Sequence, residues 1–469
     1  MQKKSDYQVI VIGGGSAGYA AARLLSDEGI KTAIIDGADE LGGLCILRGC
    51  MPSKAIIESA KRFNQILEAE KFGITLENPQ INTKAVIERK NQLIDEFKGY
   101  RQEQLVNGKF DLIRGTANFT DPHTISVSQK NSDSQILTAS HFIIANGSTV
   151  FIPEIAGLAE TGFLTSDDVL TAQSLPKSIT ILGGGAIALE LAYYYAACQT
   201  EVTIIQRSDQ LLSTMDQDIA KEIQVALEAL GVNIFCDTDI QRVTTDTEGK
   251  KTVHFNHQNH PSQVSSDEIL CGLGRSPNTT NLGCDLADIE LAKGKIKVDL
   301  TMQSSQAHIY AAGDVCSPLD VVHLAIIQAE AAAGNILKQL NNDTSDPIKV
   351  DYQLSLYGIF TEPQIAAVGM SEKEALAANI NYKTADYPFN DHGKSMVHGS
   401  EHGFVKLIVA EETGKIIGGA VIGPEAVELI HEIVVAMSFG ATARQLLEIP
   451  HYHPTLSEIW TYPAEELAT

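Results

Sequence analysis

The sequence is poor in cysteine and in positive charge, and each scarcity excludes a class of protein. Seven cysteines among 469 residues are too few for a scaffold built on disulfides, and the odd number favours reduced thiols, as in a cytosol. Lys and Arg total 35 against 59 Asp and Glu, which gives a formal net charge of −24. This balance argues against nucleic acid or an anionic membrane surface as a partner, because either would require clustered basic residues.

Long apolar runs are missing as well. The run near the start of the chain, within MQKKSDYQVIVIGGG, is too short for the apolar region of a secretory signal, and no later run reaches the roughly 18 residues of a membrane span. We therefore expect a cytoplasmic protein with no membrane segment. At about 100–200 residues per domain, the length predicts two to four domains.

One pattern occurs twice in the first half of the chain. A short apolar strand is followed by a glycine-rich turn, a helix and a second strand, first over residues 7–36 and again over residues 178–207. The predicted strands are Tyr7–Ile12, Lys31–Asp36, Ser178–Leu182 and Glu201–Ile205. Short buried strands that alternate with helices predict a parallel sheet.

Each of the two turns fits the dinucleotide-binding fingerprint, in which three small residues have separate tasks. The first permits a tight turn, the second lets a pyrophosphate approach the amides of a helix N-terminus, and the third allows close packing of helix against strand. These residues are Gly13, Gly15 and Gly18 in the first copy and Gly183, Gly185 and Ala188 in the second. Two copies in full strand–turn–helix–strand context predict two Rossmann-like nucleotide-binding domains.

The two copies differ at the position that selects the nucleotide. Asp36 occupies it in the first copy and can bind a ribose hydroxyl, whereas Gln206, followed by Arg207, occupies it in the second. A carboxylate would repel a 2′-phosphate, while an amide beside a guanidinium would accommodate one. We therefore expect the second nucleotide to be NADP rather than NAD.

Two cysteines lie close together after the first repeat, in Gly42-Gly-Leu-Cys-Ile-Leu-Arg-Gly-Cys-Met-Pro-Ser-Lys54. In a regular helix, Cys45 and Cys50 would have Cα atoms roughly 8–9 Å apart, too far for a disulfide, which needs less than about 7 Å. A bridge would require an irregular turn, for which Gly49 and Pro52 are suited. In a cytosolic nucleotide-binding protein, such a pair is more often catalytic than structural.

This segment resembles the redox-active segment of the class I pyridine nucleotide–disulfide oxidoreductases, and within that family it looks closest to dihydrolipoamide dehydrogenase. The similarity continues along the whole chain in five further motifs: Ala145-Asn-Gly-Ser148, Gly274-Arg-Ser-Pro-Asn278, Ile309-Tyr-Ala-Ala-Gly-Asp314, Phe360-Thr-Glu-Pro363 and His453-Pro-Thr-Leu-Ser-Glu458. The resemblance implies an α/β fold with two Rossmann-like three-layer domains and a C-terminal α+β dimerisation domain. The implied limits are 1–150 with 276–348 for the FAD-binding domain, 151–275 for the NAD(P)-binding domain and 349–469 for the dimerisation domain.

The resemblance also implies a catalytic set. Electrons would pass between NAD(P), FAD, the Cys45–Cys50 disulfide and a dithiol or disulfide substrate. Cys50 would be the sulfur next to the flavin and Cys45 the nucleophile that exchanges with substrate. His453 would act as acid and base, with Glu458 orienting it, and would reach the cysteine pair of the other subunit of a homodimer. Lys54 and Glu190 resemble a pair that lies by the flavin in this family.

Cofactor-binding residues follow from the same motifs. For FAD they are Gly13, Gly15, Gly18, Asp36, Lys54, Gly147, Gly313 and Asp314. For the nicotinamide nucleotide they are Gly183, Gly185, Ala188, Gln206 and Arg207, and Gly274 and Arg275 of the return crossover are also expected to bind a cofactor. No metal site is expected, since His451 and His453 lack further spaced ligands.

The expected substrate is a small dithiol or disulfide, and a lipoyl group of a 2-oxoacid dehydrogenase complex is one candidate. Leu44, Ile46-Leu-Arg48, Gln206 and Gln364 depart from the dihydrolipoamide dehydrogenase pattern. A glutathione-reductase-like enzyme, or another NADPH-dependent disulfide or quinone reductase, therefore stays open. A non-catalytic flavin-binding dimer that senses redox state is disfavoured, because it would be expected to have lost Cys45, Cys50 or His453.

Overall fold

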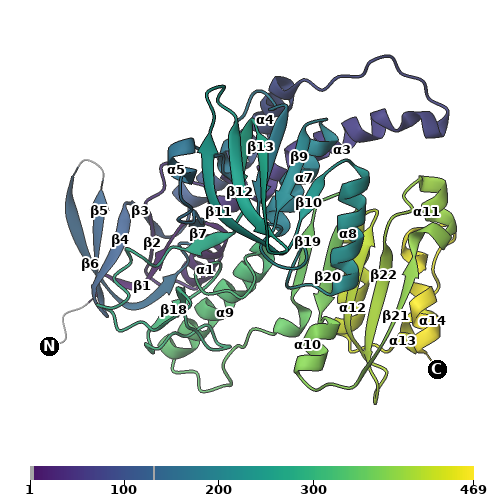
Figure 1. Cartoon of the computed structure of the whole chain (residues 1–469). Coiled ribbons are helices and arrows are strands. Elements are labelled where there is room, and N and C mark those ends of the chain that lie inside the picture. The colour runs from purple at the N-terminus through teal and green to yellow at the C-terminus, as the bar shows by residue number, and fades with distance from the viewer. Residues whose placement is uncertain (1–4, 130–131, 469) are drawn as a thin grey trace. The chain divides into compact units, whose positions relative to one another are not determined.

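The computed structural model describes residues 5–129 and 132–468 (Figure 1). Residues 1–4, 130–131 and 469, which fall inside the predicted domain limits, lie outside the described residues. The chain forms two compact units. Of the described residues, the first unit comprises 5–53, 88–129, 132–151 and 275–351, and the second comprises 54–87, 152–274 and 352–468.

A sheet with a parallel half and an antiparallel half forms the centre of the first unit. Its order is β3-β2-β1-β6-β5-β4, and β18 also pairs with β6. The strands are β1 (Tyr7–Ile12), β2 (Thr32–Asp36), β3 (Asp111–Arg114), β4 (Thr116–Asp121), β5 (Thr124–Gln129), β6 (Ser132–Ile144) and β18 (Ile309–Ala311). Pairs among β3, β2, β1, β6 and β18 are parallel, and β4, β5 and β6 form an antiparallel meander.

Two helices of the first unit, α1 (Ser16–Asp27) and α9 (Val322–Leu340), pack against each other beside this sheet. Small buried residues, among them Ala17, Ala21 and Ala332, permit the close approach. Other elements of this unit are α2 (Leu44–Leu47), β7 (Ser148–Val150), β15 (Arg275–Pro277), β16 (Leu291–Ala292) and β17 (Lys295–Ile296). The helix α4 (Thr83–Val106) contributes most of its length to this unit.

A second parallel sheet, β10-β9-β8-β14, lies in the second unit. Its strands are β8 (Ser178–Leu182), β9 (Glu201–Ile205), β10 (Asn233–Phe235) and β14 (Glu268–Cys271), and its helices are α7 (Ala186–Ala197) and α8 (Gln217–Ala229). A separate antiparallel sheet consists of β11 (Thr238–Thr245), β12 (Lys251–His257) and β13 (His260–Ser266). Two short helices precede these sheets, α5 (Leu158–Thr161) and α6 (Ser166–Val169).

The C-terminal part of the second unit is an antiparallel sheet covered by helices. Its order is β19-β20-β23-β22-β21. The strands are β19 (Leu356–Ile359), β20 (Gln364–Gly369), β21 (Tyr382–Pro388), β22 (Phe404–Ala410) and β23 (Ile416–Gly423). The helices are α10 (Glu372–Ala377), α11 (Gly393–His398), α12 (Ala426–Ser438), α13 (Ala443–Glu448) and α14 (Thr461–Leu467), with 3₁₀ turns η2 (Tyr352–Leu354), η3 (Phe389–Asp391) and η4 (Ser457–Trp460).

One helix, α3 (Cys50–Leu67), begins in the first unit and continues in the second, where the 3₁₀ turn η1 (Ala69–Phe72) follows it. Its apolar residues Ile56, Ile57 and Ala60 belong to the same core cluster as α7 and β8. Buried apolar area of this kind contributes about 25 cal/mol per Å². The second half of α3 is therefore held by the core of the second unit.

The repeated strand–turn–helix–strand pattern is confirmed in both copies. The strands β1, β8 and β9 have the predicted limits, and β2 begins at Thr32 rather than at Lys31. The predicted fold class, with two Rossmann-like domains and an α+β C-terminal domain, is also confirmed. The domain limits themselves stay predictions.

Candidate active site

The first glycine-rich turn joins β1 to α1 and has no room for side chains. Gly13 has φ +105°, which L-residues with a Cβ rarely adopt. A Cβ on Gly18 would overlap the carbonyl oxygen of Gly13, and one on Gly43 would lie 2.7 Å from the Cα of Gly15. Gly15 is the N-cap of α1 and supplies no side-chain hydrogen bond, so a bound anion can accept from the first amides of the helix. This cradle fits the pyrophosphate of FAD.

Asp36, the last residue of β2, is fixed beside this turn. Its Oδ2 accepts a hydrogen bond from the Gly14 amide at 2.8 Å, and its Oδ1 accepts from the Ala38 amide at 2.9 Å. The Arg114 guanidinium lies 3.5 Å from Oδ1. An ionised carboxylate has about four acceptor sites, so Asp36 retains acceptor capacity for the ribose hydroxyl that the sequence predicts it to bind.

Asp314 and the two crossover segments form one hydrogen-bonded network in the first unit. The Ser148 hydroxyl donates to Asp314 Oδ2 at 2.6 Å, and Arg275 donates from Nε to the Ser148 hydroxyl at 2.7 Å. Arg275 also donates from Nη2 to the Ser148 carbonyl at 2.8 Å. Gly147 and Gly313 flank these residues with φ of +69° and +78°. The network fixes the carboxylate that the family resemblance assigns to the ribityl chain of FAD.

Asn146 differs from the threonine that the family pattern has, and the structure gives this amide a specific partner. Asn146 Nδ2 donates to the Asn278 carbonyl and Asn278 Nδ2 donates to the Asn146 carbonyl, both at 2.7 Å. The reciprocal pair joins the two crossover segments, which pair as β7 and β15. The departure at this position therefore preserves the crossover.

The second glycine-rich turn, between β8 and α7, has the same construction. Gly183 has φ +108°, and a Cβ there would lie 2.5 Å from the Gly272 carbonyl oxygen. Nothing lies within 4 Å of a Cβ placed on Gly185, and Ala188 fills the third position. Gly274, with φ +104°, begins the crossover back from this domain.

Gln206 takes the place beside the second turn that Asp36 takes beside the first. A Cβ on Gly184 would lie 3.1 Å from the Gln206 Cδ, and one on Gly14 would lie 2.7 Å from the Asp36 Oδ2. Gln206 is buried, and its side-chain amide, which carries no charge, donates from Nε2 to the Gln210 carbonyl at 3.2 Å. Arg207 follows it and is exposed to solvent.

The cysteine pair lies where the helical path is interrupted. Cys45 is half-buried in α2, α3 begins at the exposed Cys50, and Arg48 and Gly49 between them are not helical. A Cβ on Gly49 would lie 3.0 Å from the Leu44 carbonyl oxygen and 3.2 Å from the Cys45 Cα. The irregular turn that a bridge requires is therefore present, and it depends on glycine at position 49.

The structure brings Lys54 and Glu190 together. Lys54 Nζ lies 2.9 and 2.8 Å from the two Glu190 carboxylate oxygens and 4.7 Å from the centre of the Phe360 ring. The Phe360 amide also donates to Glu190 Oε1 at 2.9 Å. Glu190 is buried on α7, so this ion pair is held in one arrangement rather than solvated.

His453 and Glu458 form a base and its orienting partner in the second unit. His453 Nδ1 lies 3.1 and 3.0 Å from the two Glu458 carboxylate oxygens. The His453 side chain is 80% exposed and that of Glu458 only 12%. The glutamate is thus anchored at η4, while the opposite nitrogen of His453 is presented outward, as proton transfer to an external group requires.

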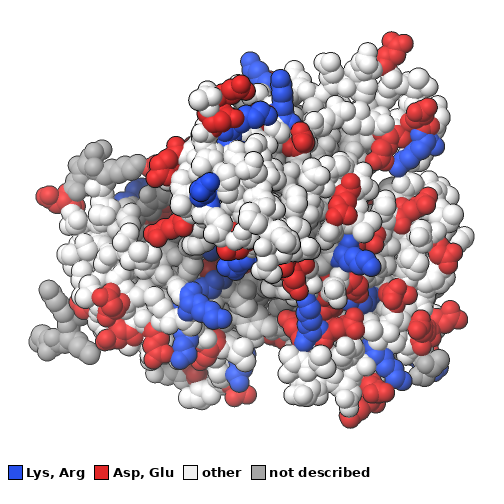
Figure 2. All heavy atoms as spheres, in the orientation of Figure 1, with Lys and Arg blue, Asp and Glu red and all other residues white. Residues whose placement is uncertain are grey.

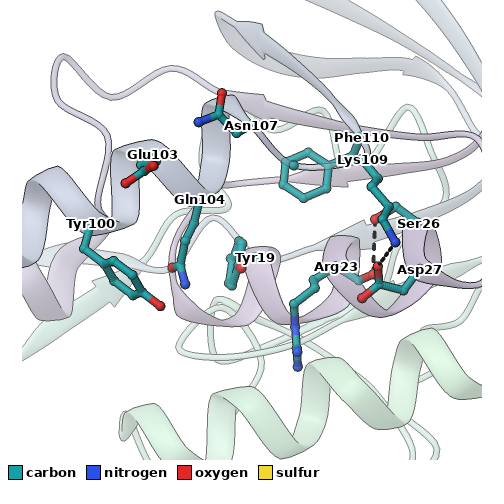
Figure 3. A pocket seen from close by; sticks show the side chains of 11 residues that line it. Tyr19, Arg23, Ser26, Asp27, Tyr100, Glu103, Gln104, Asn107, Lys109 and Phe110 are labelled. Carbon is teal, nitrogen blue, oxygen red and sulfur yellow. Dashed lines mark hydrogen bonds and ion pairs between the residues drawn. The ribbon is translucent and has the colours of Figure 1, made fainter.

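A groove of about 440 Å³ lies in the first unit between α1 and the C-terminal end of α4 (Figure 3). Tyr19 and Arg23 from α1 and Gln104 from α4 line it together with Phe110. Two of its charged lining residues, Lys109 and Asp27, form an ion pair at 2.8 Å. Arg101 lies near the groove, with its guanidinium 4.4 Å from the centre of the Tyr19 ring.

Sequence reasoning missed two residues near the predicted catalytic groups. Burial lowers the pKa of Arg101, and negative charge at Tyr19, Cys45 and Tyr100 opposes that effect, which places this cation in the environment of Cys45. His392 is buried and lies 3.5 Å from Glu458. No spacing in the sequence connects position 101 with 45 or position 392 with 458, because the members of each pair come near one another only in the folded chain.

Lys and Arg are interspersed with Asp and Glu on the face that Figure 2 shows, without a broad basic surface. Within residues 5–129 and 132–468, no helix is long and apolar enough to cross a membrane. The same residues contain no group of three or more His, Cys, Asp and Glu that could hold a metal ion.

The two glycine-rich turns, the cysteines on either side of the break between α2 and α3, and the His453–Glu458 pair are features expected of a flavin- and nicotinamide-dependent disulfide oxidoreductase. Residues 7–332 match the family model for pyridine nucleotide-disulphide oxidoreductases, and residues 356–464 match the model for the dimerisation domain of the same family. The chain belongs to the pyridine nucleotide-disulphide oxidoreductase family. Its cofactors are FAD and a nicotinamide nucleotide.

Curated relatives and solved structures agree with this assignment. The chain is 33% identical over 469 residues to dihydrolipoyl dehydrogenase of Bacillus subtilis (strain 168), covering 97% of this chain and 96% of the relative. It is 32% identical over 463 residues to dihydrolipoyl dehydrogenase of Geobacillus stearothermophilus, covering 98% and 96%. The Cu(II) complex of a mutant of the HOCl-induced flavoprotein disulfide reductase RclA from Escherichia coli superposes with a TM-score of 0.86 at 25% identity, covering 98% of this chain and 99% of that one.

Proposed function

We propose that this enzyme exchanges electrons between NADP(H) and a small dithiol or disulfide through Cys45 and Cys50, with His453 as acid and base. The observation that carries the proposal is the His453–Glu458 pair, whose carboxylate oxygens lie 3.0 and 3.1 Å from Nδ1 of an outward-facing imidazole. An imidazole held in this way has its Nε2 available to receive and return a proton. The cysteine pair at the interrupted helix supplies the groups that need such a proton acceptor.

In the proposed reaction, the two cysteines reduce a substrate disulfide in two thiol–disulfide exchange steps. When bound, FAD supplies the two-electron step between the nicotinamide nucleotide and the disulfide. The Cys45 thiolate then attacks a substrate disulfide, a mixed disulfide forms, and the departing thiolate takes a proton from His453. Next, the Cys50 thiolate attacks the Cys45 sulfur and re-forms the internal disulfide, and the second substrate group leaves as a thiolate. His453, which has regained a proton from solvent, protonates this thiolate to the second thiol. Run in the opposite direction, the same steps oxidise a dithiol.

Several residues would hold the cofactors in this scheme. Gly13, Gly15, Gly18 and the crossover glycines Gly147 and Gly313 would let FAD approach the backbone, as Gly183, Gly185, Ala188 and Gly274 would for the nicotinamide nucleotide. Asp36 and Asp314 would bind sugar hydroxyls, and Arg275 would position Asp314 through Ser148. Lys54, compensated by Glu190, would place a positive charge at the flavin.

The active unit in this scheme is a homodimer in which His453 serves the cysteine pair of the other subunit. Support comes from the dimerisation-domain match at residues 356–464 and from exposed apolar side chains in the C-terminal part that contains His453. Phe439 is 85% exposed and Tyr452 is 80% exposed in the single chain. Apolar groups of this size would be covered by a second copy.

Gln206 and Arg207 support NADP rather than NAD as the nucleotide. The neutral amide lies where a carboxylate would repel a 2′-phosphate, and the exposed guanidinium next to it can bind one in bidentate fashion. A comparison of kcat/KM for NADPH and NADH tests this. We expect NADPH to be preferred and the R207A variant to lose most of that preference, and equal use of NADH would contradict the assignment.

A lipoyl group is the first candidate substrate, since the curated relatives at 32–33% identity are dihydrolipoyl dehydrogenases. The second candidate is another low-molecular-weight disulfide or a quinone reduced with NADPH, which Gln206 and Arg207 favour. Turnover with dihydrolipoamide, lipoamide, glutathione disulfide and a quinone, each with both nucleotides, distinguishes the two. Substantial activity with dihydrolipoamide and NAD would support the first and exclude the second.

A reductive titration of the FAD-loaded protein tests the roles of the cysteines. We expect a long-wavelength band between the Cys50 thiolate and the oxidised flavin after two electrons. The C45S variant should keep this band, and the C50S variant should lack it. A band that is lost in C45S and kept in C50S would reverse the assignment, and turnover by both variants would exclude the cysteine pair altogether.

A further inference from the structure

His392 is a second histidine on the glutamate that orients His453. It lies between η3 and α11, its side chain is 1% exposed, and its Nε2 lies 3.5 Å from Glu458 Oε1. Its Nδ1 lies 2.7 Å from the Ser395 hydroxyl, which is itself buried. Glu458 is therefore placed between two imidazoles, one exposed and one buried, within the C-terminal part of the second unit.

The contacts of His392 select one tautomer of its ring. If the Ser395 hydroxyl donates to Nδ1, the proton of the neutral ring is on Nε2 and points toward the Glu458 carboxylate. The other tautomer would set the Nε2 lone pair against that carboxylate, which is repulsive. Within the described residues, His392 Nε2 is buried without a hydrogen-bond partner, and the Glu458 carboxylate, 3.5 Å away, is the acceptor that the geometry offers this N–H.

The surroundings of His392 keep the ring neutral. Burial lowers the pKa of His392 and the positive charge of His453 adds to this, while the charge and hydrogen bond of Glu458 oppose it. Tyr462 of α14 packs edge-on against the ring at 6.2 Å, and Tyr462 in turn stacks on Tyr387 of β21 at 4.0 Å. The ring thus faces Glu458, His453, Ser395 and a phenol ring, and Glu458 is the one anion among these.

We propose that His392 is a positioning residue for the acid–base histidine, donating from Nε2 to Glu458 so that this carboxylate is held toward Nδ1 of His453. The inference rests on the proposed function, because it assigns to His392 a task only if His453 transfers protons. Glu458 then accepts from His453 and from the Thr455 amide, at 3.4 Å, as well as from His392. A carboxylate with donors on three sides cannot rotate away when His453 gains and loses its proton.

A hydrogen bond from His392 to Glu458 would affect the pH dependence of the proposed reaction. A neutral N–H donor withdraws part of the negative charge of Glu458 from His453. Removal of the donor leaves the carboxylate more basic and stabilises the His453 imidazolium. In the direction that oxidises a dithiol, His453 must be neutral to accept the proton, so the acidic limb of the pH profile of kcat/KM should move to higher pH when His392 is replaced by an apolar residue.

The test compares H392L with H392Q in the FAD-loaded dimer, because the glutamine amide places a donor near the position of Nε2 and leucine does not. We expect H392L to lose about tenfold in kcat at neutral pH, with the acidic limb raised by about half a pH unit. H392Q should retain most of both properties. H398Q is the matched control, since His398 is an exposed histidine on α11, and it should behave as the wild type.

A second readout does not depend on turnover. Hydrogen–deuterium exchange at the imidazole carbon, followed by mass spectrometry, gives the titration midpoint of His453 as a single residue. This midpoint should move upward in H392L and stay in place in H392Q. If H392L does not fold, S395A replaces it. Without the Ser395 hydroxyl at Nδ1, the His392 proton is no longer held on Nε2. The midpoint of His453 should then move in the same direction by a smaller amount.

A double variant separates this inference from the proposed function. If His392 acts through Glu458, H392L should cause no further change in kcat or in the midpoint of His453 when E458Q is already present. An unchanged His453 midpoint in H392L and in S395A overturns the positioning role, whatever their stability. Full activity of H453Q would instead overturn the proposed function, and the two failures are thus distinguishable.

Discussion

Arg101 places a positive charge in the environment of the proposed nucleophile. Its guanidinium stacks on Tyr19 at 4.4 Å, and within the described residues its Nε and Nη1 are buried without hydrogen-bond partners. Burial lowers the pKa of this group and negative charge at Tyr19 and Cys45 acts against that, but a guanidinium stays protonated in proteins. A nearby fixed cation stabilises a thiolate relative to its thiol.

Replacement of Arg101 should therefore change the reactivity of Cys45. In R101M, the pH midpoint for alkylation of Cys45 should rise by about one unit, because the thiolate loses its cation. The measurement is the rate of reaction of the reduced enzyme with iodoacetamide against pH, with the modified cysteine identified by peptide mapping. R101K keeps the charge and is the matched control. Identical profiles for R101M and wild type would show that the cation does not act on Cys45.

Gly18 illustrates a residue whose role is steric. A Cβ at this position would overlap the Gly13 carbonyl oxygen and would lie 3.3 Å from Val11 Cγ1. The G18A variant should lose about 2–4 kcal/mol of stability and bind FAD weakly, as overpacked positions do. G185A in the second turn is the control, since nothing lies within 4 Å of the added Cβ. Thermal unfolding and the flavin content of the purified variants measure both effects, and equal flavin content in the two variants would contradict the steric argument.

At the scale of elements, the buried Lys406 of β22 links three segments of the second unit. Its Nζ lies 2.9 Å from Asp216 at the N-cap of α8, 2.7 Å from Asp218 and 2.9 Å from Glu372 of α10. Burial disfavours the charged lysine, but the hydrogen bonds to Asp218, Asp216 and Glu372 outweigh this and raise the pKa of Lys406. Burial also opposes the charge of Asp216, yet the bond to Lys406 leaves the pKa of Asp216 lowered.

The K406M variant should lose about 3 kcal/mol of unfolding free energy, because Asp216 would be left as an uncompensated buried charge. K383M is the matched control on the adjacent strand β21, where the lysine is exposed, and it should change stability by less than about 0.5 kcal/mol. Urea unfolding measures the difference. The D216N/K406M double variant should recover part of the loss, and a loss as large as that of K406M alone would contradict this explanation.

The ion pairs of Lys406 stabilise the folded chain only within a limited range of pH. A depressed Asp216 pKa adds stability that is complete above its unfolded value of about 3.9 and is lost as the pH falls through the folded value. A raised Lys406 pKa adds stability that is complete below about 10.4 and is lost as the pH rises through the folded value. The stability difference between wild type and K406M should therefore be constant between these limits and shrink outside them.

Local and non-local features differ in how far the sequence predicts them. The limits of β1, β8 and β9 follow from an apolar run that ends at glycine or at a polar residue, a signal contained in a few neighbouring residues. The family motifs likewise locate His453 and Glu458. The partners of Lys406 do not follow, because Asp216 and Glu372 approach it only after two sheets have formed and packed.

His392 shows the same limit within the site. Nothing in its local sequence distinguishes it from the exposed His398, six positions later, since burial and the approach of Glu458 are properties of the packed domain. The break at Gly49 is an intermediate case. The spacing of Cys45 and Cys50 indicates that a bridge would require an irregular turn, but the close approach of Gly49 to the Leu44 carbonyl could be seen only in the structure.

In the proposed homodimer, each active site would contain residues from both subunits. In a single chain the His453 side chain is 80% exposed. An active site that excludes water protects its acid–base group from competing proton transfer to solvent. Exposed Val435 and Phe439 lie at the end of α12 in the same C-terminal part. A second copy placed there would cover this surface and bring the histidine to a cysteine pair that is not its own.

Mixed dimers test this directly. A dimer with C45S in one subunit and H453Q in the other, isolated through two different tags, should keep about half of the wild-type activity, because one of its two shared sites is intact. A dimer of wild type with the C45S/H453Q double variant should be inactive, since each shared site then lacks one group. If each site were formed within a single chain, the two results would be exchanged: the first dimer would be inactive and the second would keep half of the activity.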